Sequence, residues 1–356
     1  MHTKTIFRAC LLALAVAIGW PSPSVAGTVQ GSDQQHAFDF HFGTWQTRIM
    51  SRDVTASGVG AWVKFTGTVI DQPLWQGRAN LEKIEASGVG GHFQGLTLFL
   101  YNPKSGQWSE QFAGSSSGTM QEPTYGEFSN GRGVFHGMTE SAGKKVLERD
   151  IWSNITPDSY HYEIASSVDG GKTWVTNFVA QLTRLKQTSD DEARYTPGTG
   201  SEHDFDFNMG HWTTRVRAVL NSLSSPGVWS DLKGTHVVYR VWDDWANIGQ
   251  LEVDGPGGHV EDLALRLYDR KTHQWRVYFA NSKSGTLAPP MLGEFSSGVG
   301  TFVGMDEIDG KTVLTRNIWS GMTAKSCRQD WAISTDGGKT WVLTWTSADT
   351  LASSSR

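Results

Sequence analysis

Two histidines stand at matching positions in two related stretches of the chain. His92 follows Gly90-Gly91, His259 follows Gly257-Gly258, and each begins a largely apolar run. A histidine in such a place can contact a ligand, ligate haem or exchange a proton near neutral pH. It can also be a turn residue hydrogen-bonded to the backbone. The pair is therefore a candidate ligand contact, with a structural role as the alternative.

Two arginines lie within apolar strand patterns. Arg149 alternates with Leu147 and Ile151, and Arg316 lies in a matching pattern later in the chain. Side chains two residues apart share one face of a strand, so each guanidinium needs a partner in an apolar setting. We expect each arginine either to stack on a tryptophan or to bind an anion inside the fold.

Asp39 and Asp206 each lie inside a Phe-Asp-Phe triplet. We expect these carboxylates to cap a short helical turn or to meet an arginine, with acid–base catalysis as the alternative. The chain has no Gly-x-Ser-x-Gly motif, no P-loop and no dinucleotide-binding fingerprint. Cys327 is the single cysteine after residue 26, and the histidines lack metal-ligand spacing. We therefore predict no metal site and assign no catalytic residue.

These candidates all belong to an internal duplication. An offset of 167 residues carries His36 onto His203 and needs no insertion or deletion. The repeat is too long for a solenoid unit, so we predict two domains, 36–185 and 203–351, joined by a linker over 186–202. The same offset places six tryptophans on six others, beginning with Trp45, Trp62, Trp75, Trp108, Trp152 and Trp174.

Each half has the pattern of an all-β domain. The segments 93–101 and 146–153 have strand composition, and turn signals such as Asn130-Gly131 recur about every 8–12 residues. We predict two tandem antiparallel up-and-down β-barrels, because closure removes exposed sheet edges. The segments 167–174 and 334–341 fit the Asp-box hairpin of propellers, but two copies this far apart indicate only a structural hairpin.

The N-terminal segment is predicted to direct export. Lys4 and Arg8 precede an apolar stretch over 9–20, and Ser24-Val25-Ala26 has the pattern of a cleavage site. We expect a signal peptide over 1–26, a secreted, periplasmic protein, and no transmembrane segment after cleavage. The net charge is −5 without a basic stripe, which argues against nucleic-acid binding.

The opening of each half resembles a known family. An ordered set of residues resembles the DUF1579-like bacterial proteins, which are similar to calycins, the lipocalin-like barrels: Phe38-Asp39-Phe40, Gly43, Trp45, the run 98–101 and Gln107-Trp108. The resemblance implies that Gly43 and Gly210 permit a tight start of the first strand. It also implies that Trp45 and Trp212 plug the barrel floors, with the two strand arginines as the candidates to cover them.

Calycins are mostly ligand carriers, so the resemblance favours binding of small apolar or amphipathic molecules. We predict no cofactor and leave open whether the protein is an enzyme. Trp75 and Trp242 are candidate cavity walls beside the histidine and arginine pairs. One alternative is a calycin-type enzyme or haem protein that uses those histidines and arginines. Another is an envelope module that binds glycan or protein through exposed Trp245, Trp331 and Trp345.

Overall fold

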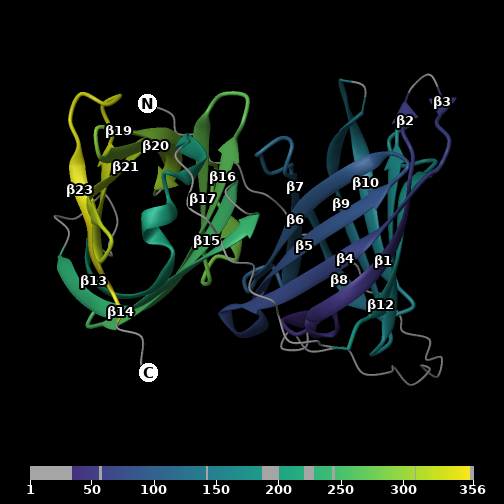
Figure 1. The fold of residues 1–356 in the computed structure, drawn as a ribbon, viewed down its shortest axis with the longest axis horizontal. Coiled ribbons are helices and arrows are strands. Elements are labelled where there is room, and N and C mark those ends of the chain that lie inside the picture. Colours follow the sequence, from purple (N-terminus) through teal and green to yellow (C-terminus); the bar gives the residue numbers. More distant parts are fainter. Residues whose placement is uncertain are drawn as a thin grey trace, which may run out of the picture.

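The computed structural model describes residues 34–55, 58–141, 143–186, 200–219, 228–242, 245–308 and 310–352. These residues form two closed ten-strand antiparallel β-barrels in tandem (Figure 1). The all-β prediction is therefore confirmed. The predicted signal peptide and most of the predicted linker lie outside the described residues. Within them, no helix is long and apolar enough to cross a membrane.

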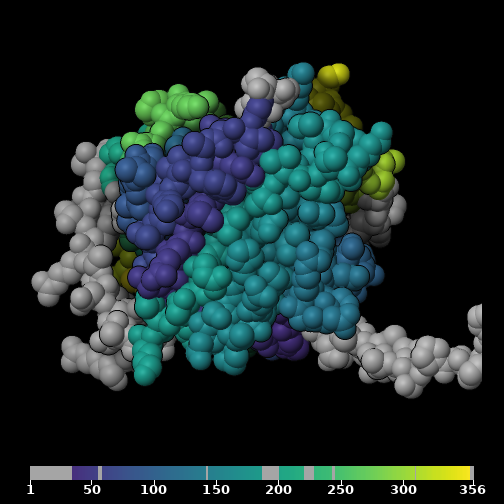
Figure 2. All heavy atoms as spheres, turned by 90° about the vertical axis from the view of Figure 1, so that its right-hand side faces the viewer, coloured from purple at the N-terminus to yellow at the C-terminus, as the bar shows by residue number. Residues whose placement is uncertain are grey.

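The first barrel is built by neighbouring strands in chain order, and β1 closes it by pairing with both β4 and β12. Figure 2 shows its outer wall, where the strands run diagonally across the face. A small hairpin, β2 (Val54–Thr55) and β3 (Gly58–Val59), lies outside the ring. The ring strands are β1 (Gly43–Ser51), β4 (Val63–Leu74), β5 (Ala79–Gly88), β6 (Gly91–Asn102), β7 (Gln107–Gly114), β8 (Thr124–Ser129), β9 (Arg132–Ser141), β10 (Lys144–Ser153), β11 (Ser159–Ser167) and β12 (Val175–Arg184).

The second barrel repeats this order, and the pairing of β16 with β17 closes its ring. The short β18 (Thr286–Leu287) adds to β17 at the side. Equivalent strands in the two barrels begin 167 residues apart nearly throughout, so the gapless duplication holds in three dimensions. The ring strands are β13 (Gly210–Val219), β14 (Trp229–Trp242), β15 (Ala246–Gly255), β16 (Gly258–Asp269), β17 (Gln274–Asn281), β19 (Met291–Ser296), β20 (Val299–Ile308), β21 (Lys311–Thr323), β22 (Ser326–Ser334) and β23 (Val342–Leu351).

The barrels pack against each other through the outer faces of β5 and β6 and of β15 and β16 (Figure 1). Period-two alternation explains how one strand serves two environments. In β6, Leu96, Leu98 and Leu100 belong to the core between the barrels, whereas Phe99 and Tyr101 belong to the core of the first barrel. An ion pair between Arg78 and Glu261, at 2.5 Å, lies beside this apolar interface.

Two glycines hold the barrels close at equivalent loops. A side-chain carbon on Gly118 would lie 2.4 Å from the carbonyl oxygen of Tyr268, and one on Gly285 would lie 1.8 Å from that of Tyr101. Each loop therefore reaches the backbone of the other barrel, and the contact is reciprocal. Only glycine permits this approach.

We expect Gly285→Ala to destabilise the protein more than Gly298→Ala. Both glycines have positive φ, 58° and 74°, so both variants carry a strain of roughly 1 kcal/mol or more. Only Gly285 faces a close backbone atom, since nothing lies within 4 Å of the added carbon at Gly298. Denaturant midpoints measure the difference, and equal shifts for the two variants would contradict the close contact.

The floor of each barrel is a buried tryptophan at the start of the first strand. The indole N–H of Trp45 donates to the carbonyl of His41 at 2.7 Å, and that of Trp212 donates to Asn208 at 2.8 Å. Gly43 has φ of +117°, and a side chain there would meet Arg184 at 2.8 Å. Gly210 has the same φ of +117°, but a side chain there would meet Leu351 at 3.5 Å instead.

The arginine that covers the first floor is Arg184, not Arg149. Arg184 is the cross-strand partner of Trp45, lies 4.0 Å from its ring centre, and donates to the carbonyls of Phe40 and Phe42 at 2.7 Å. The second barrel has Leu351 at this position, opposite Trp212. The expectation that strand arginines in β10 and β21 cover the floors is therefore wrong.

Arg149 and Arg316 instead stack on the outer hairpins. Their guanidinium carbons lie 4.5 and 4.3 Å from the ring centres of Trp174 and Trp341. These tryptophans end the Asp-box hairpins, where Asp169 accepts from the backbone N–H groups of residues 172 and 173 at 3.0 and 2.9 Å. Because these hydrogen bonds favour the carboxylate, they lower the pKa of Asp169 to about 2.

The Phe-Asp-Phe triplets begin the short 3-10 turns η1 (Asp39–His41) and η4 (Asp206–Asn208). Neither aspartate caps its turn through the side chain. Asp39 pairs with His36 at 3.2 Å, whereas Asp206 pairs with Arg240 at 2.8 Å. The capping expectation is thus wrong. Asp206 also contacts His203 at 3.3 Å, as Asp39 contacts His36, and among the described residues an arginine partner is found for Asp206 and not for Asp39.

Candidate functional site

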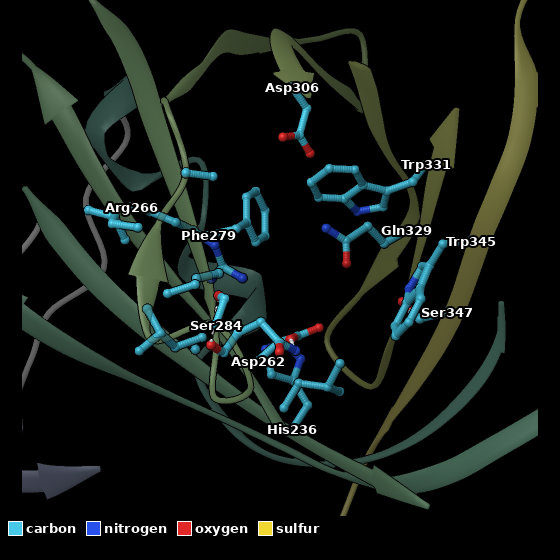
Figure 3. Close-up of a pocket in the computed structure, with 18 of the residues that line it drawn as sticks. His236, Asp262, Arg266, Phe279, Ser284, Asp306, Gln329, Trp331, Trp345 and Ser347 are labelled. Carbon is cyan, nitrogen blue, oxygen red and sulfur yellow. Dashed lines mark hydrogen bonds between the residues drawn. The ribbon is translucent and has the colours of Figure 1, made fainter. Parts of the chain in front are cut away.

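Residues of the second barrel line a cavity of about 600 Å³. Figure 3 shows Arg266, Asp262 and His236 across the cavity from Trp331 and Trp345. This volume lies within the range of about 300–1,000 Å³ typical of small-molecule sites. The cavity is therefore a candidate small-molecule site.

Arg266 of β16 is the cation of this cavity. It is 1 % exposed, and its Nη1 donates to the side-chain oxygens of Asn208 and Asn247 at 3.0 and 2.9 Å. Its guanidinium carbon lies 4.6 Å from the ring centre of Phe205 and 5.1 Å from that of Trp319. Burial lowers its pKa to about 10, so the group stays charged at neutral pH.

His236 of β14 and Asp349 of β23 form a buried pair at the same cavity. The imidazole Nδ1 lies 2.8 Å from Asp349 Oδ2, and the Thr214 hydroxyl donates to Oδ1. Burial alone would raise the pKa of Asp349, but the bonds from His236 and Thr214 lower it below its ordinary value. The carboxylate therefore holds the imidazole in place, with Nε2 turned away from it.

Gly249 of β15 lets the side chains of His236 and Arg266 pack closely against its backbone. A side-chain carbon on Gly249 would lie 2.7 Å from His236 Nε2 and 3.4 Å from Arg266 Nη2. Two nitrogen groups thus converge on one point of the cavity. An oxygen atom of a ligand in the cavity beside these two side chains would accept from the guanidinium and contact the imidazole.

The opposite wall is aromatic. Trp331 of β22 and Trp345 of β23 line the cavity, and Phe279 of β17 packs against Trp331 with ring centres 4.7 Å apart (Figure 3). Such flat apolar surfaces suit the body of an amphipathic molecule. These two tryptophans therefore face the barrel interior, whereas the glycan- or protein-binding alternative required them on the outer surface.

Burial changes the pKa of Asp262, which lines this cavity, and of Cys327, which lies behind Asp349. Burial raises the pKa of Asp262, which accepts from Asn281, to about 6. Burial also raises the pKa of the Cys327 thiol to about 12, so this thiol stays protonated. Cys327 is a buried neighbour of Asp349 and is not an activated nucleophile.

The first barrel encloses a smaller cavity of about 320 Å³ with a different lining. Glu82 of β5, Glu110 of β7, and Glu148 and Asp150 of β10 contribute carboxyl groups. Tyr162 donates to Glu110 at 2.6 Å, and Trp152 donates to it at 3.4 Å. The cavity is therefore acidic and aromatic.

Burial in this acidic wall favours the protonated carboxyl groups. Burial is the largest cause that raises the pKa of Glu110 to about 8. The negative charges of Glu82 and Glu148 contribute to this increase. Burial and the charges of Glu110 and Glu148 also raise the pKa of Asp150 well above its ordinary value. Removing these groups from water disfavours the charged forms.

A histidine lies below the carboxyl groups. His41 is fully buried, with its nitrogens 3.5 Å from Asp71 and 3.1 Å from Glu82. Burial lowers its pKa, but the charges of Asp71 and Glu82 outweigh that effect and raise the pKa above its ordinary value. Asn80 also donates to both oxygens of Asp71 at 2.9 and 3.0 Å. This network fills the base of the cavity.

We expect Glu110→Gln to remove a pH dependence of stability. Between pH 4.5 and about 8 the folded protein holds a proton that the unfolded chain has released at Glu110. The free energy of unfolding therefore falls as pH rises through this window, and the neutral glutamine abolishes that part of the fall. Urea unfolding across the window measures it. The exposed Glu127→Gln is the control, and parallel curves for wild type and Glu110→Gln would contradict the shift.

The predicted histidines lie outside both cavities. His92 and His259 are exposed at hairpin tips, where they contact Ser87 at 3.0 Å and Asp254 at 2.8 Å. Neither residue lines a cavity, which agrees with the turn role. His259, Glu252 and Glu261 offer ligand atoms within 4.8 Å of one another, but Glu261 is already paired with Arg78.

Trp75 and Trp242 also lie away from the cavities. Both are buried in the core between the barrels, 7 % and 4 % exposed. Arg149 and Arg316 line neither cavity. The structure therefore brings none of the six predicted ligand contacts into a cavity.

The residues that do line the cavities differ between the repeats. His236 corresponds to Val69, and Arg266 corresponds to Phe99. Residues that occur in both halves build the shared barrel wall, so repetition in the sequence indicates wall residues rather than cavity residues. The cavity residues are better indicated by a difference between the repeats: a strand position that is polar in one repeat and apolar in the other.

No protein-family model and no curated protein matches the chain, so the DUF1579-like resemblance assigns no family. Similar solved structures include a DUF3598 protein from Nostoc punctiforme, at 8 % identity and TM-score 0.25, with 90 % of this chain and 99 % of that chain covered. EF1p2_mFAP2b bound to DFHBI has 12 % identity and TM-score 0.25, covering 43 % and 99 %. Transferrin-binding protein B from Haemophilus parasuis has 9 % identity and TM-score 0.17, covering 87 % and 76 %. Similarity this weak indicates no function.

Proposed function

We propose that the second barrel binds a small amphipathic molecule whose head group presents a carbonyl or carboxylate oxygen. The head lies at Gly249, between Arg266 and His236, and the apolar body lies along Trp331 and Trp345. The observation that carries this proposal is that a guanidinium and an imidazole lie side by side against Gly249 and both line the same 600 Å³ cavity.

The energetics of Arg266 support this assignment. A buried guanidinium is costly to keep in an apolar core unless its donors are used. Two asparagine oxygens occupy Nη1, while Nη2 is directed toward the space above Gly249. A ligand oxygen there would complete the hydrogen bonding of a charge already removed from water. Because residues 1–26 are predicted to be a signal peptide, we also propose that this binding protein is secreted.

We expect octanoate and 2-octanone to bind, and Arg266→Met to weaken both by at least about tenfold, or roughly 1.4 kcal/mol. Isothermal titration calorimetry measures the affinities. Arg316→Met is the matched control, because Arg316 also stacks on a tryptophan but does so on the outside of the same barrel. It should leave binding unchanged.

A second variant tests whether weaker binding by Arg266→Met could result from loss of folding alone. Gly249→Leu retains Arg266 and fills the head-group space, so it should also abolish binding while the circular dichroism spectrum persists. Absence of binding to the wild-type protein, or equal binding by Arg266→Met and Arg316→Met, would overturn the proposal.

The His236–Asp349 pair favours a second candidate, an enzyme that moves a proton next to a carbonyl group. His236 Nε2 would take the proton from the carbon beside the carbonyl, and the negative charge would pass to the oxygen facing Arg266. Asp349 would stabilise the resulting imidazolium. Return of the proton to a different carbon would give an isomer.

We expect bound 2-octanone to exchange its protons beside the carbonyl for deuterium in D₂O if this second candidate is correct. Mass spectrometry measures the incorporation, and His236→Gln should reduce it to the buffer rate. Exchange at the buffer rate in wild-type protein that binds 2-octanone would leave the binding function alone.

A further inference from the structure

The carboxyl groups of the first cavity are not required by the barrel wall. The second barrel, which has the same strand order, places Gly249, Val277, Thr315 and Asn317 at the positions of Glu82, Glu110, Glu148 and Asp150. Burying carboxyl groups lowers stability unless they gain partners. Because the same wall is built without them in the second barrel, packing does not explain their presence in the first.

Aromatic rings lie among these carboxyl groups. Trp152 and Tyr162 have ring centres 4.5 Å apart, and Phe178 lies 6.1 Å from Tyr162. All three residues line the cavity. Aromatic faces combined with carboxylates are the setting in which proteins hold organic cations.

Two hydroxyl groups of the lining have no protein partner. Tyr160 and Thr47 are both fully buried, and neither hydroxyl oxygen is hydrogen-bonded within the described part of the chain. Buried polar groups are normally satisfied. Their position at the cavity indicates that a ligand or its water shell completes them.

We propose that the first barrel binds an organic cation, an ammonium group carrying a short apolar chain, with the cation between Glu110, Asp150 and the face of Trp152. The positive charge would stabilise carboxylates that otherwise lack a partner cation. Arg52 is the one basic side chain on the described lining, and it is already held 4.2 Å from the ring centre of Trp62. The proposal concerns a different cavity from the one in the second barrel and does not depend on it.

A bare metal ion fits this cavity less well. A metal needs several ligand atoms converging on one point. Within the described residues, the three-ligand set with atoms inside 4.8 Å is Glu252, His259 and Glu261, on the other barrel. The carboxyl groups of the first cavity are more widely spaced, as a bulky ammonium group requires.

Octyltrimethylammonium tests the proposal, and octanoate, with the same chain length and the opposite charge, is its partner probe. We expect calorimetry to show octyltrimethylammonium binding to the full chain. The Glu110→Gln/Asp150→Asn variant should bind it at least about tenfold more weakly. Glu148→Gln, at a partly exposed position, should give a smaller loss in the same direction. Glu127→Gln, at an exposed position of the same barrel outside the cavity, should leave octyltrimethylammonium binding unchanged.

A structural role for the carboxyl groups predicts a different result. If they only support the fold, Glu110→Gln/Asp150→Asn lowers the unfolding midpoint, whereas a binding role predicts an equal or higher midpoint together with weaker binding. Failure of octyltrimethylammonium to bind, binding unaffected by these variants, or displacement by Ca²⁺ at a similar concentration would overturn the proposal. Octanoate binding reports on the second barrel separately.

Discussion

The alternation of side chains across two closed walls is the constraint on which the rest of this structure depends. Along β6, leucines at 96, 98 and 100 enter the core between the barrels, while Thr97 and Phe99 face the first interior. A slip of one residue would exchange the two sets. Because the duplication is gapless, both barrels keep this register, and every cavity position in one has a defined counterpart in the other.

That register explains which features could be predicted. The shared tryptophans, glycines and Asp-box hairpins build the wall, and their repetition was visible in the sequence. The floor cover was missed because Trp45 and Arg184 meet only when the first and last strands pair. No local pattern reveals that pairing. The cavity residues were missed for a related reason: strands such as β6 are apolar on both faces, so periodicity alone does not say which face is inward.

The two barrels share the residues that build their walls but differ in residues that line their cavities. The change from Phe99 to Arg266 and from Glu82 to Gly249 replaces an acidic, partly filled interior with an open one that contains a buried cation. Each barrel thus serves as an internal comparison for the other. A polar residue at a position where the counterpart barrel has an apolar or small residue is not needed for closure. Because burying such a polar residue costs free energy, its presence indicates a role in ligand binding.

Packing between the barrels makes each barrel depend on the other, although their interiors differ. The leucines on the outer face of β6, and Leu263, Leu265 and Leu267 on β16, are buried only because the two walls cover each other. Either barrel alone would expose a contiguous apolar patch, which soluble domains rarely tolerate. The reciprocal contacts of Gly118 and Gly285 make that covering specific. The outer faces therefore pack the two halves into one unit. Only the inner faces can then differ between the barrels without exposing this apolar surface.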